Sequence, residues 1–168
     1  MLLLLKLKVD LWNSSMEIIS HIIDNKTGKA RKLPIVFDTG AYLTIIHDKT
    51  LLRAGYNVNK ASNATINVVG RKNVPAKELL LRGFVLEDIE GNKTNIGPVW
   101  VYSTDMSDAE TDAVLGLNVI KEFETKITFG QETIIELTPT YDINDKVKYE
   151  NFNRTESRFG LWVPSQIK

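Results

Sequence analysis

The sequence contains no cysteine and only two histidines among its 168 residues. Without cysteine, neither a disulfide framework nor a thiolate zinc site can form, and a reducing compartment is the simplest setting, so we expect a cytoplasmic location. His21 and His47 lie far apart and lack the close spacing of paired zinc ligands. We therefore expect no metal and no other cofactor.

The chain also lacks an excess of charge of either sign and a long apolar run. Lys plus Arg and Asp plus Glu both number 21, so the formal net charge is zero. Without a long-range field or a basic patch, we expect no binding to nucleic acid or to an anionic membrane. The N-terminal apolar run, Leu2 to Leu5, is interrupted by Lys6. It is too short for a signal peptide, and a membrane span needs about 20 apolar residues.

Most of the chain consists of short apolar, β-branched segments separated by Gly, Asn and Asp. This pattern predicts many short strands with tight turns and hairpins, typical of an all-β barrel or sandwich. A helical turn is expected at 48–54, with Asp48 as N-cap and Gly55 as stop, and a second at 119–123. The expected strands are 3–9, 16–23, 33–37, 43–46, 65–69, 74–81, 84–86, 96–102, 126–129 and 133–137. The turn residues at 24–29, with Gly28, predict a hairpin of the strands on either side.

The length and the distribution of apolar residues predict one domain with an extension. We expect a domain at 1–138, with its core at 16–138. The segment 139–168 is more polar but carries single aromatic residues, which would be costly to leave in water. It is predicted to pack as an extension on the domain or on a partner.

One segment carries recognisable chemistry: Asp38-Thr39-Gly40-Ala41, which directly follows the apolar run Ile35 to Phe37. The carboxylate can act as an acid or base, and the Thr39 hydroxyl can lock the turn. Gly40 has no side chain, so backbone or substrate can approach closely. Asp and Gly are also ordinary turn residues, so the triplet alone fits a plain turn as well.

A second motif lies downstream, where Val114-Leu115-Gly116 precedes the apolar spacing of a short helix. The order of the two motifs, with a hairpin around Gly70 between them, resembles the retroviral-type (retropepsin-like) aspartic peptidases. The resemblance runs from about 16 to 139 and includes closing strands at 126–130 and 134–137. It implies an all-β half-barrel with one short helix after the second Gly motif.

The resemblance also implies roles for individual residues. The catalytic turn would be Asp38, Thr39 and Gly40, and the hairpin around Gly70 would be a mobile flap over the substrate. The substrate-binding residues would be Ala41, Val68, Val69, Gly70, Val114, Leu115 and Gly116.

A peptidase of this type needs two carboxylates that share one proton and hold a water between them. This chain has a single Asp-Thr-Gly, so a second copy must supply the partner. We expect a homodimeric endopeptidase that hydrolyses polypeptides with a water activated by two Asp38 carboxylates. The alternative is a catalytically inactive dimerisation or peptide-binding module of the same fold.

The chain departs from the viral pattern at three positions. Viral members carry an acidic residue where Tyr42 stands and an arginine where Leu117 stands, and these form an ion pair near the dimer interface. Both are missing together, so no lone charge is stranded, but a dimer must be held otherwise. The flap carries one glycine, Gly70. In these features the sequence is more similar to bacterial and retrotransposon-derived members.

Other conspicuous residues have structural interpretations. Trp12 and Trp100 are expected in core or interface packing. His47 is expected at the surface after a strand. The acidic loop from Asp105 to Asp112 is expected to be solvated, because it lacks the Asp/Asn alternation of a calcium loop.

Overall fold

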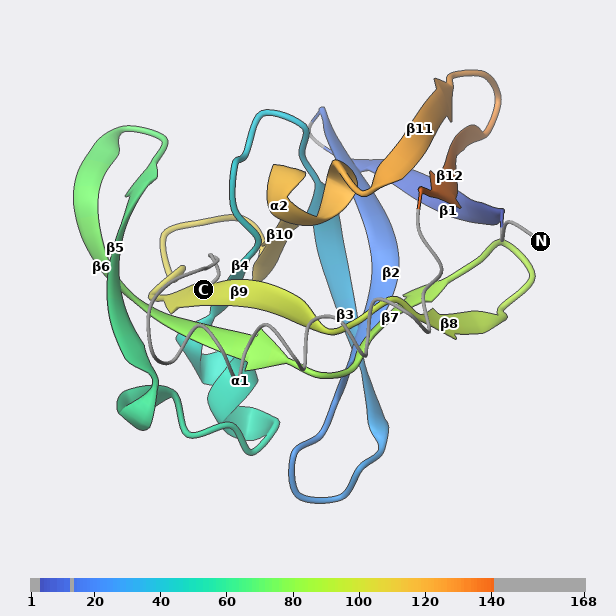
Figure 1. Cartoon of the computed structure of the whole chain (residues 1–168). Coiled ribbons are helices and arrows are strands. Elements are labelled where there is room, and N and C mark those ends of the chain that lie inside the picture. The colour runs from blue at the N-terminus through green and yellow to red at the C-terminus, as the bar shows by residue number, and fades with distance from the viewer. Residues whose placement is uncertain (1–3, 13, 141–168) are drawn as a thin grey trace.

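A computed structural model describes residues 4–12 and 14–140 of the chain. Within these residues, twelve strands form one hydrogen-bonded network, and the helices are short (Figure 1). The helices are α1 (Asp48–Arg53), the 3-10 helix η1 (Val58–Lys60) and α2 (Leu117–Ile120). The strands are β1 (Leu5–Trp12), β2 (Ser15–Ile23), β3 (Ala30–Phe37), β4 (Ile45–His47), β5 (Ser62–Val68), β6 (Arg71–Leu81), β7 (Phe84–Glu87), β8 (Lys93–Asn95), β9 (Val99–Thr104), β10 (Ala113–Leu115), β11 (Phe123–Thr128) and β12 (Thr133–Pro139).

The hairpin of β2 and β3 supports the loop that follows β3. The two strands pair antiparallel from Glu17 opposite Val36 to Ile23 opposite Ala30. Asp24 fixes their turn by accepting hydrogen bonds from the backbone N–H groups of Lys26 and Thr27. The predicted hairpin is confirmed, and it places the end of β3 in the middle of the molecule.

Strand β10 fills the gap between β3 and β4. It pairs parallel with β3, where Val114 lies opposite Val36, and antiparallel with β4, where Val114 lies opposite Ile45. The chain therefore leaves β3, passes through the loop 38–44 and returns along the far side of β10. Because β3 and β10 run parallel side by side, the residues that follow β3 lie beside those that follow β10.

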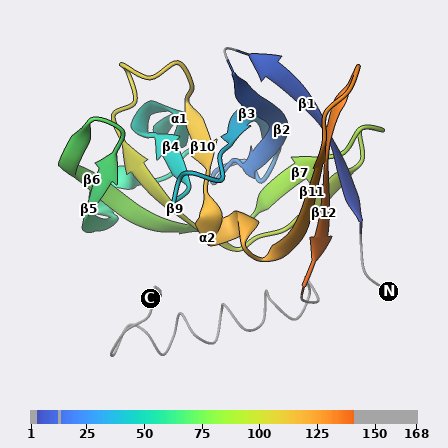
Figure 2. The ribbon, with the colours of Figure 1, turned by 90° about the horizontal axis from the view of Figure 1, so that it is seen from above.

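Strands β5 and β6 form a hairpin that extends from the body of the protein. Residues Ser62 to Ile66 pair with Glu78 to Val74, and the register shifts between Ile66 and Val68. Gly70 turns the chain at the tip with a φ of +79°, in the region that favours glycine. Figure 2 shows this hairpin and the strands β1, β11 and β12 at opposite ends of the molecule. The predicted strand-turn-strand unit is confirmed.

The core is apolar and continuous across the sheet. Its fully buried members include Phe37, Ile46, Leu81, Phe84 and Leu115, which come from five different strands. Burial of side chains of this size stabilises the fold by about 1.5–3 kcal/mol each. Buried residues alternate with exposed ones in β1 and with half-buried ones in β12, which follows the period of two expected for strands.

Several expectations about single elements are wrong. The strand expected to begin at Ile96 begins at Val99, after Pro98, which has no N–H group for a ladder. Asp48 is the first residue of α1 rather than its N-cap, which is His47. His47 is also buried, with 7% of its surface exposed, because loop 105–112 covers it. Trp12 is 45% exposed, so it does not lie in the core, and the alternative that it packs at an interface stays a prediction.

The predicted division into 1–138 and an extension at 139–168 stays a prediction. Strand β12 ends at Pro139 after pairing with both β1 and β11. The residues expected to pack as an extension, 141–168, lie outside the described residues.

Candidate active site

Asp38 emerges at the end of β3, directly after the buried Phe37. Its N–H group donates to the carbonyl of Leu115 at 3.0 Å, which ties the turn to β10. The N–H of Gly40 donates to Asp38 Oδ1 at 2.8 Å, and the N–H of Ala41 donates to the Asp38 carbonyl at 3.2 Å. The carboxyl group is thus held in one orientation, with its second oxygen left for other partners.

The Thr39 side chain is exposed, and the hydrogen bonds described above that close the turn are accepted by the side chain and carbonyl of Asp38. The expectation that the Thr39 hydroxyl locks the turn stays a prediction. A Cβ at Gly40 would lie 3.2 Å from Asp38 Oδ1, so the carboxyl group would have to shift by a few tenths of an ångström.

Behind the turn, a buried hydroxyl connects the two glycine motifs. Thr44, which has no exposed surface, accepts a hydrogen bond from the N–H of Gly116 at 3.1 Å. It donates its own proton to Asn118 Oδ1 at 2.8 Å. The Asn118 amide in turn donates to the carbonyl of Trp100 at 2.9 Å. Each of these polar groups is satisfied, as buried groups must be, so the network fixes the loop after Asp38.

The start of α2 adds two backbone bonds to the same loop. The N–H of Leu117 donates to Ala41 at 2.7 Å, and the N–H of Asn118 donates to Tyr42 at 3.0 Å. The first turn of a helix has N–H groups without intrahelical partners, and here the loop after Asp38 supplies carbonyl acceptors for two of them. Asp38 therefore lies on a loop supported by β10 and α2 together.

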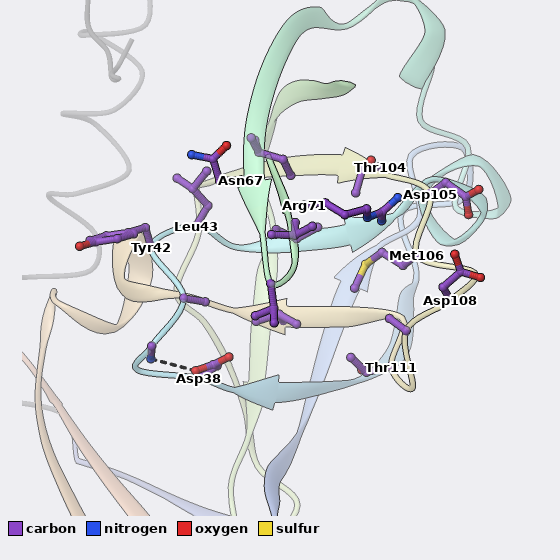
Figure 3. Close-up of a pocket in the computed structure, with 18 of the residues that line it drawn as sticks. Asp38, Tyr42, Leu43, Asn67, Arg71, Thr104, Asp105, Met106, Asp108 and Thr111 are labelled. Carbon is purple, nitrogen blue, oxygen red and sulfur yellow. Dashed lines mark hydrogen bonds between the residues drawn. The ribbon is translucent and has the colours of Figure 1, made fainter. Parts of the chain in front are cut away.

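A cleft of about 770 Å³ lies between this turn, the β5–β6 hairpin and the loop 105–112. Figure 3 shows Asp38 at one end of the cleft and Asp105, Met106 and Asp108 at the other. The cleft is lined by Asp38, Gly40, Ala41, Tyr42, Leu43, Ile45, Thr65, Ile66, Asn67, Val68, Val69, Arg71, Thr104, Asp105, Met106, Asp108, Ala109, Thr111 and Val114. Its mixture of apolar walls and few polar groups is typical of a ligand site.

The residues singled out in the sequence divide into two groups. Asp38, Gly40, Ala41, Val68, Val69 and Val114 line the cleft. Leu115 and Gly116 are buried behind it, while Thr39 and Gly70 are exposed and do not line it. The roles assigned to these residues remain predictions, since their positions do not test them.

Sequence reasoning missed a large part of the cleft wall. Arg71 from the hairpin and the loop residues Asp105, Met106 and Asp108 all line it. The acidic loop was expected to be merely solvated, and its acidic side chains are indeed exposed, but two of them, Asp105 and Asp108, line the cleft. The only signal for the cleft-lining position of this loop was that it follows β9, the strand next to the hairpin.

Asp105 is the acidic residue of the loop whose titration is most clearly perturbed. The Ser107 hydroxyl and the Ser107 N–H both donate to Asp105 Oδ1, and these bonds hold the pKa of Asp105 below its usual range. The nearby positive charges of His47, when protonated, and Lys49 act in the same direction. Asp105 therefore stays ionised in mildly acidic solution.

The described residues offer no group of three or more His, Cys, Asp or Glu side chains that could hold a metal ion. The polar side chains that line the cleft carry carboxyl groups, hydroxyl groups, one amide and the guanidinium of Arg71. Across residues 4–12 and 14–140, no helix is long and apolar enough to cross a membrane.

Comparisons with known proteins place this geometry among solved structures. No protein-family model matches the sequence, and no curated protein matches it. The fold is similar to that of a retropepsin-like aspartic protease from Rickettsia conorii, with a TM-score of 0.55 and 13% identity over 83% of this chain and 92% of that chain. A retroviral protease-like domain of Ddi1 from Leishmania major covers 77% of this chain and 95% of its own, with 14% identity and a TM-score of 0.42.

The similarity to the Rickettsia structure shows the fold. The chain has the all-β retropepsin-like fold, with a short helix directly after Gly116. The predicted fold class and the resemblance on which it was based are confirmed at this level. At 13% identity the likeness carries no assignment of individual residues.

Proposed function

We propose that the protein is an aspartic endopeptidase that acts as a homodimer. Two Asp38 carboxyl groups, one from each copy, would share a proton and hold the water that attacks the scissile carbonyl. The observation that carries the proposal is the fixed Asp38 turn at one end of a cleft. A hairpin borders the same cleft, in a fold shared with a retropepsin-like aspartic protease.

The geometry of the turn suits this chemistry. Asp38 Oδ1 accepts from the Gly40 N–H, so the carboxyl plane is fixed and Oδ2 remains for a water or a second carboxyl group. Two carboxylates at close range cannot both ionise, and the pair therefore retains one proton. The ionised member would take a proton from the water while the protonated member donates to the carbonyl oxygen.

The residues that line the cleft support the proposal of a second copy. Its other carboxyl groups, Asp105 and Asp108, stand on the loop at the far end from Asp38 (Figure 3). They are exposed and are not placed to share a proton with Asp38. A two-fold axis beside the Asp38 turn would instead bring two identical carboxyl groups together.

The substrate would be an extended polypeptide. Strand β5 is the last strand of the sheet order and pairs only with β6 among the described strands. An extended peptide in the cleft could form main-chain hydrogen bonds with the β5–β6 hairpin, and the apolar wall of Val68, Val69 and Val114 would receive its side chains.

The experiment presents a library of unfolded proteins to the wild type and to Asp38→Asn at several pH values, with products identified by mass spectrometry. Peptides that appear only with the wild type support the proposal. Tyr42 and Leu117 stand where viral members carry an acidic residue and an arginine. This difference favours the inactive binding module as the second candidate. That candidate predicts identical product patterns from both proteins under all conditions.

A further inference from the structure

Loop 105–112 forms one wall of the cleft but contains no helix or strand. Its residues Asp105, Met106, Asp108, Ala109 and Thr111 line the cleft. Internal bonds, such as the one from the Ala109 N–H to the Met106 carbonyl at 2.9 Å, shape the loop but do not attach it to the body. The position of this wall therefore depends on bonds from the loop to other elements.

His47 attaches both ends of the loop. Its backbone N–H donates to the carbonyl of Asp112 at 2.8 Å. Its ring Nδ1 accepts a hydrogen bond from the N–H of Met106 at 3.3 Å. His47 is the last residue of β4 and is 7% exposed, so the loop is attached to a strand of the sheet.

The bond to Met106 determines the protonation state of the ring. A backbone N–H can only donate, so Nδ1 must present a lone pair, and the imidazole is neutral with its proton on Nε2. A protonated ring has N–H groups on both nitrogens and cannot accept. Protonation of His47 would therefore leave the Met106 N–H facing another donor.

The charged groups around His47 belong to the loop and to α1. Asp105 interacts electrostatically with His47, and Lys49 acts on the same carboxylate. Asp48 follows His47 in the chain, where its carboxylate accepts from the Ser103 hydroxyl, and Asp112 contributes its backbone carbonyl. These are the charged groups nearest to the His47 ring.

We propose that His47 is a positioning residue for substrate binding: its neutral imidazole holds loop 105–112 against the cleft, and protonation releases Met106. The Met106 side chain lines the cleft (Figure 3), so a shift of its backbone moves a substrate contact. The inference rests on the proposed function for its ligand, a polypeptide. It predicts that peptide affinity falls when His47 takes up a proton.

The first test measures peptide binding in the Asp38→Asn background, where the catalytic pair cannot titrate. The probe is a peptide that the wild type cleaves, and its affinity is followed from neutral to mildly acidic pH. We expect affinity to fall by about threefold to tenfold as His47 is protonated, the effect of losing about one hydrogen bond. With His47→Leu added, affinity should already be low at neutral pH and should not change.

His21, the other histidine, is the matched control. It is equally buried, but it pairs with Glu87 on β7 and does not line the cleft. The Asp38→Asn, His21→Leu double variant should retain the pH dependence of Asp38→Asn. The inference is overturned if the His47→Leu double variant shows that same pH dependence.

The second test uses the wild type alone, so it needs neither a folded variant nor a substrate. The His47 ring and the Met106 amide are followed by NMR as the pH is lowered. The Met106 amide should shift and lose protection from exchange with the same midpoint as the His47 ring. If the Met106 amide does not change as the His47 ring titrates, the inference is overturned. If the two titrate together but no peptide is cleaved, the result counts only against the proposed peptidase.

Discussion

The carbonyl group of Leu43 occupies the space that a Cβ on Gly116 would need. A Cβ at this position would overlap the Leu43 carbonyl oxygen and lie 2.8 Å from the Leu43 nitrogen. Both groups are backbone, so neither can rotate away as a side chain would. The loop after Asp38 and the strand β10 can cross at this distance only because position 116 has no side chain.

Replacing Gly116 with alanine should therefore separate the loop from β10. We expect the free energy of unfolding to fall by at least about 1–3 kcal/mol, the typical cost of overpacking. The Gly116 N–H would also move from Thr44, so peptidase activity should fall further than stability alone explains. Denaturant unfolding and a peptide cleavage assay measure the two effects.

Gly130→Ala is the matched control for this prediction. A Cβ at Gly130 meets its nearest atom, the Glu132 carbonyl oxygen, at an ordinary 3.7 Å. This variant should leave both stability and cleavage close to those of the wild type. If the two alanine substitutions had equal effects, the close approach of the Leu43 backbone would not be what excludes a side chain at position 116.

Most of the elements that support the site could be predicted from the sequence, because their signals come from residues adjacent in the chain. The apolar run before Asp38 predicted a strand, and the Val114-Leu115-Gly116 motif predicted a short helix after Gly116; both are present, whereas strand β10 was not among the expected strands. Turn residues around Gly28 and Gly70 predicted the two hairpins, since turn chemistry depends on neighbours in the chain.

The wall formed by loop 105–112 was not predictable, because its position depends on contacts distant in sequence. Met106 bonds to His47, which is 59 residues away, and neither residue belongs to a motif. His47 was wrongly expected at the surface for the same reason: only the folded loop buries it. The cleft-lining position of Arg71 likewise follows from the direction of the hairpin in space.

The β5–β6 hairpin should be more mobile than the β2–β3 hairpin. Strand β5 lies at the end of the sheet order, and Val69 at its tip is fully exposed. A lid of this kind must open for a substrate to enter. In hydrogen exchange, amides of residues 65–74 should exchange much faster than those of β2 and β3. Equal protection in the two hairpins would argue against a flap.

Ser107→Ala should raise the pKa of Asp105 towards its ordinary value. The hydroxyl of Ser107 is the largest influence that lowers it, and the variant keeps the backbone bond. Because a lowered pKa stabilises the folded loop only where the carboxyl group is ionised, that contribution is lost as pH falls through the folded value. Carboxyl NMR of Asp105 measures the change, and an unaltered midpoint would contradict the assigned cause.

Cleavage activity should depend on dimer formation. Each chain supplies one Asp38 turn, so activity per molecule should rise with concentration near the dissociation constant and then level off. Activity assays over a dilution series, with sedimentation of the same samples, compare the two curves. Full activity from a strictly monomeric protein would refute the shared site.

Asp38→Asn should abolish turnover while leaving the fold intact. The asparagine Oδ1 can still accept from the Gly40 N–H, so the turn keeps its shape, but the group that takes the proton from water is gone. We expect kcat to fall by more than about 10³-fold, within the range for loss of a general base. The melting temperature should stay equal or rise, because two crowded carboxyl groups destabilise the native dimer.

The matched control for Asp38→Asn is Asp108→Asn, the same chemical change in the same cleft. Asp108 lines the cleft but is exposed on the loop, so its loss should alter KM at most. The wild type should show a bell-shaped dependence of kcat on pH, because the pair functions only while it holds one proton. Steady-state kinetics of the three proteins across pH separate these outcomes. If Asp108→Asn loses kcat as completely as Asp38→Asn, Asp38 is not the sole essential carboxylate, and the symmetric pair is the wrong mechanism.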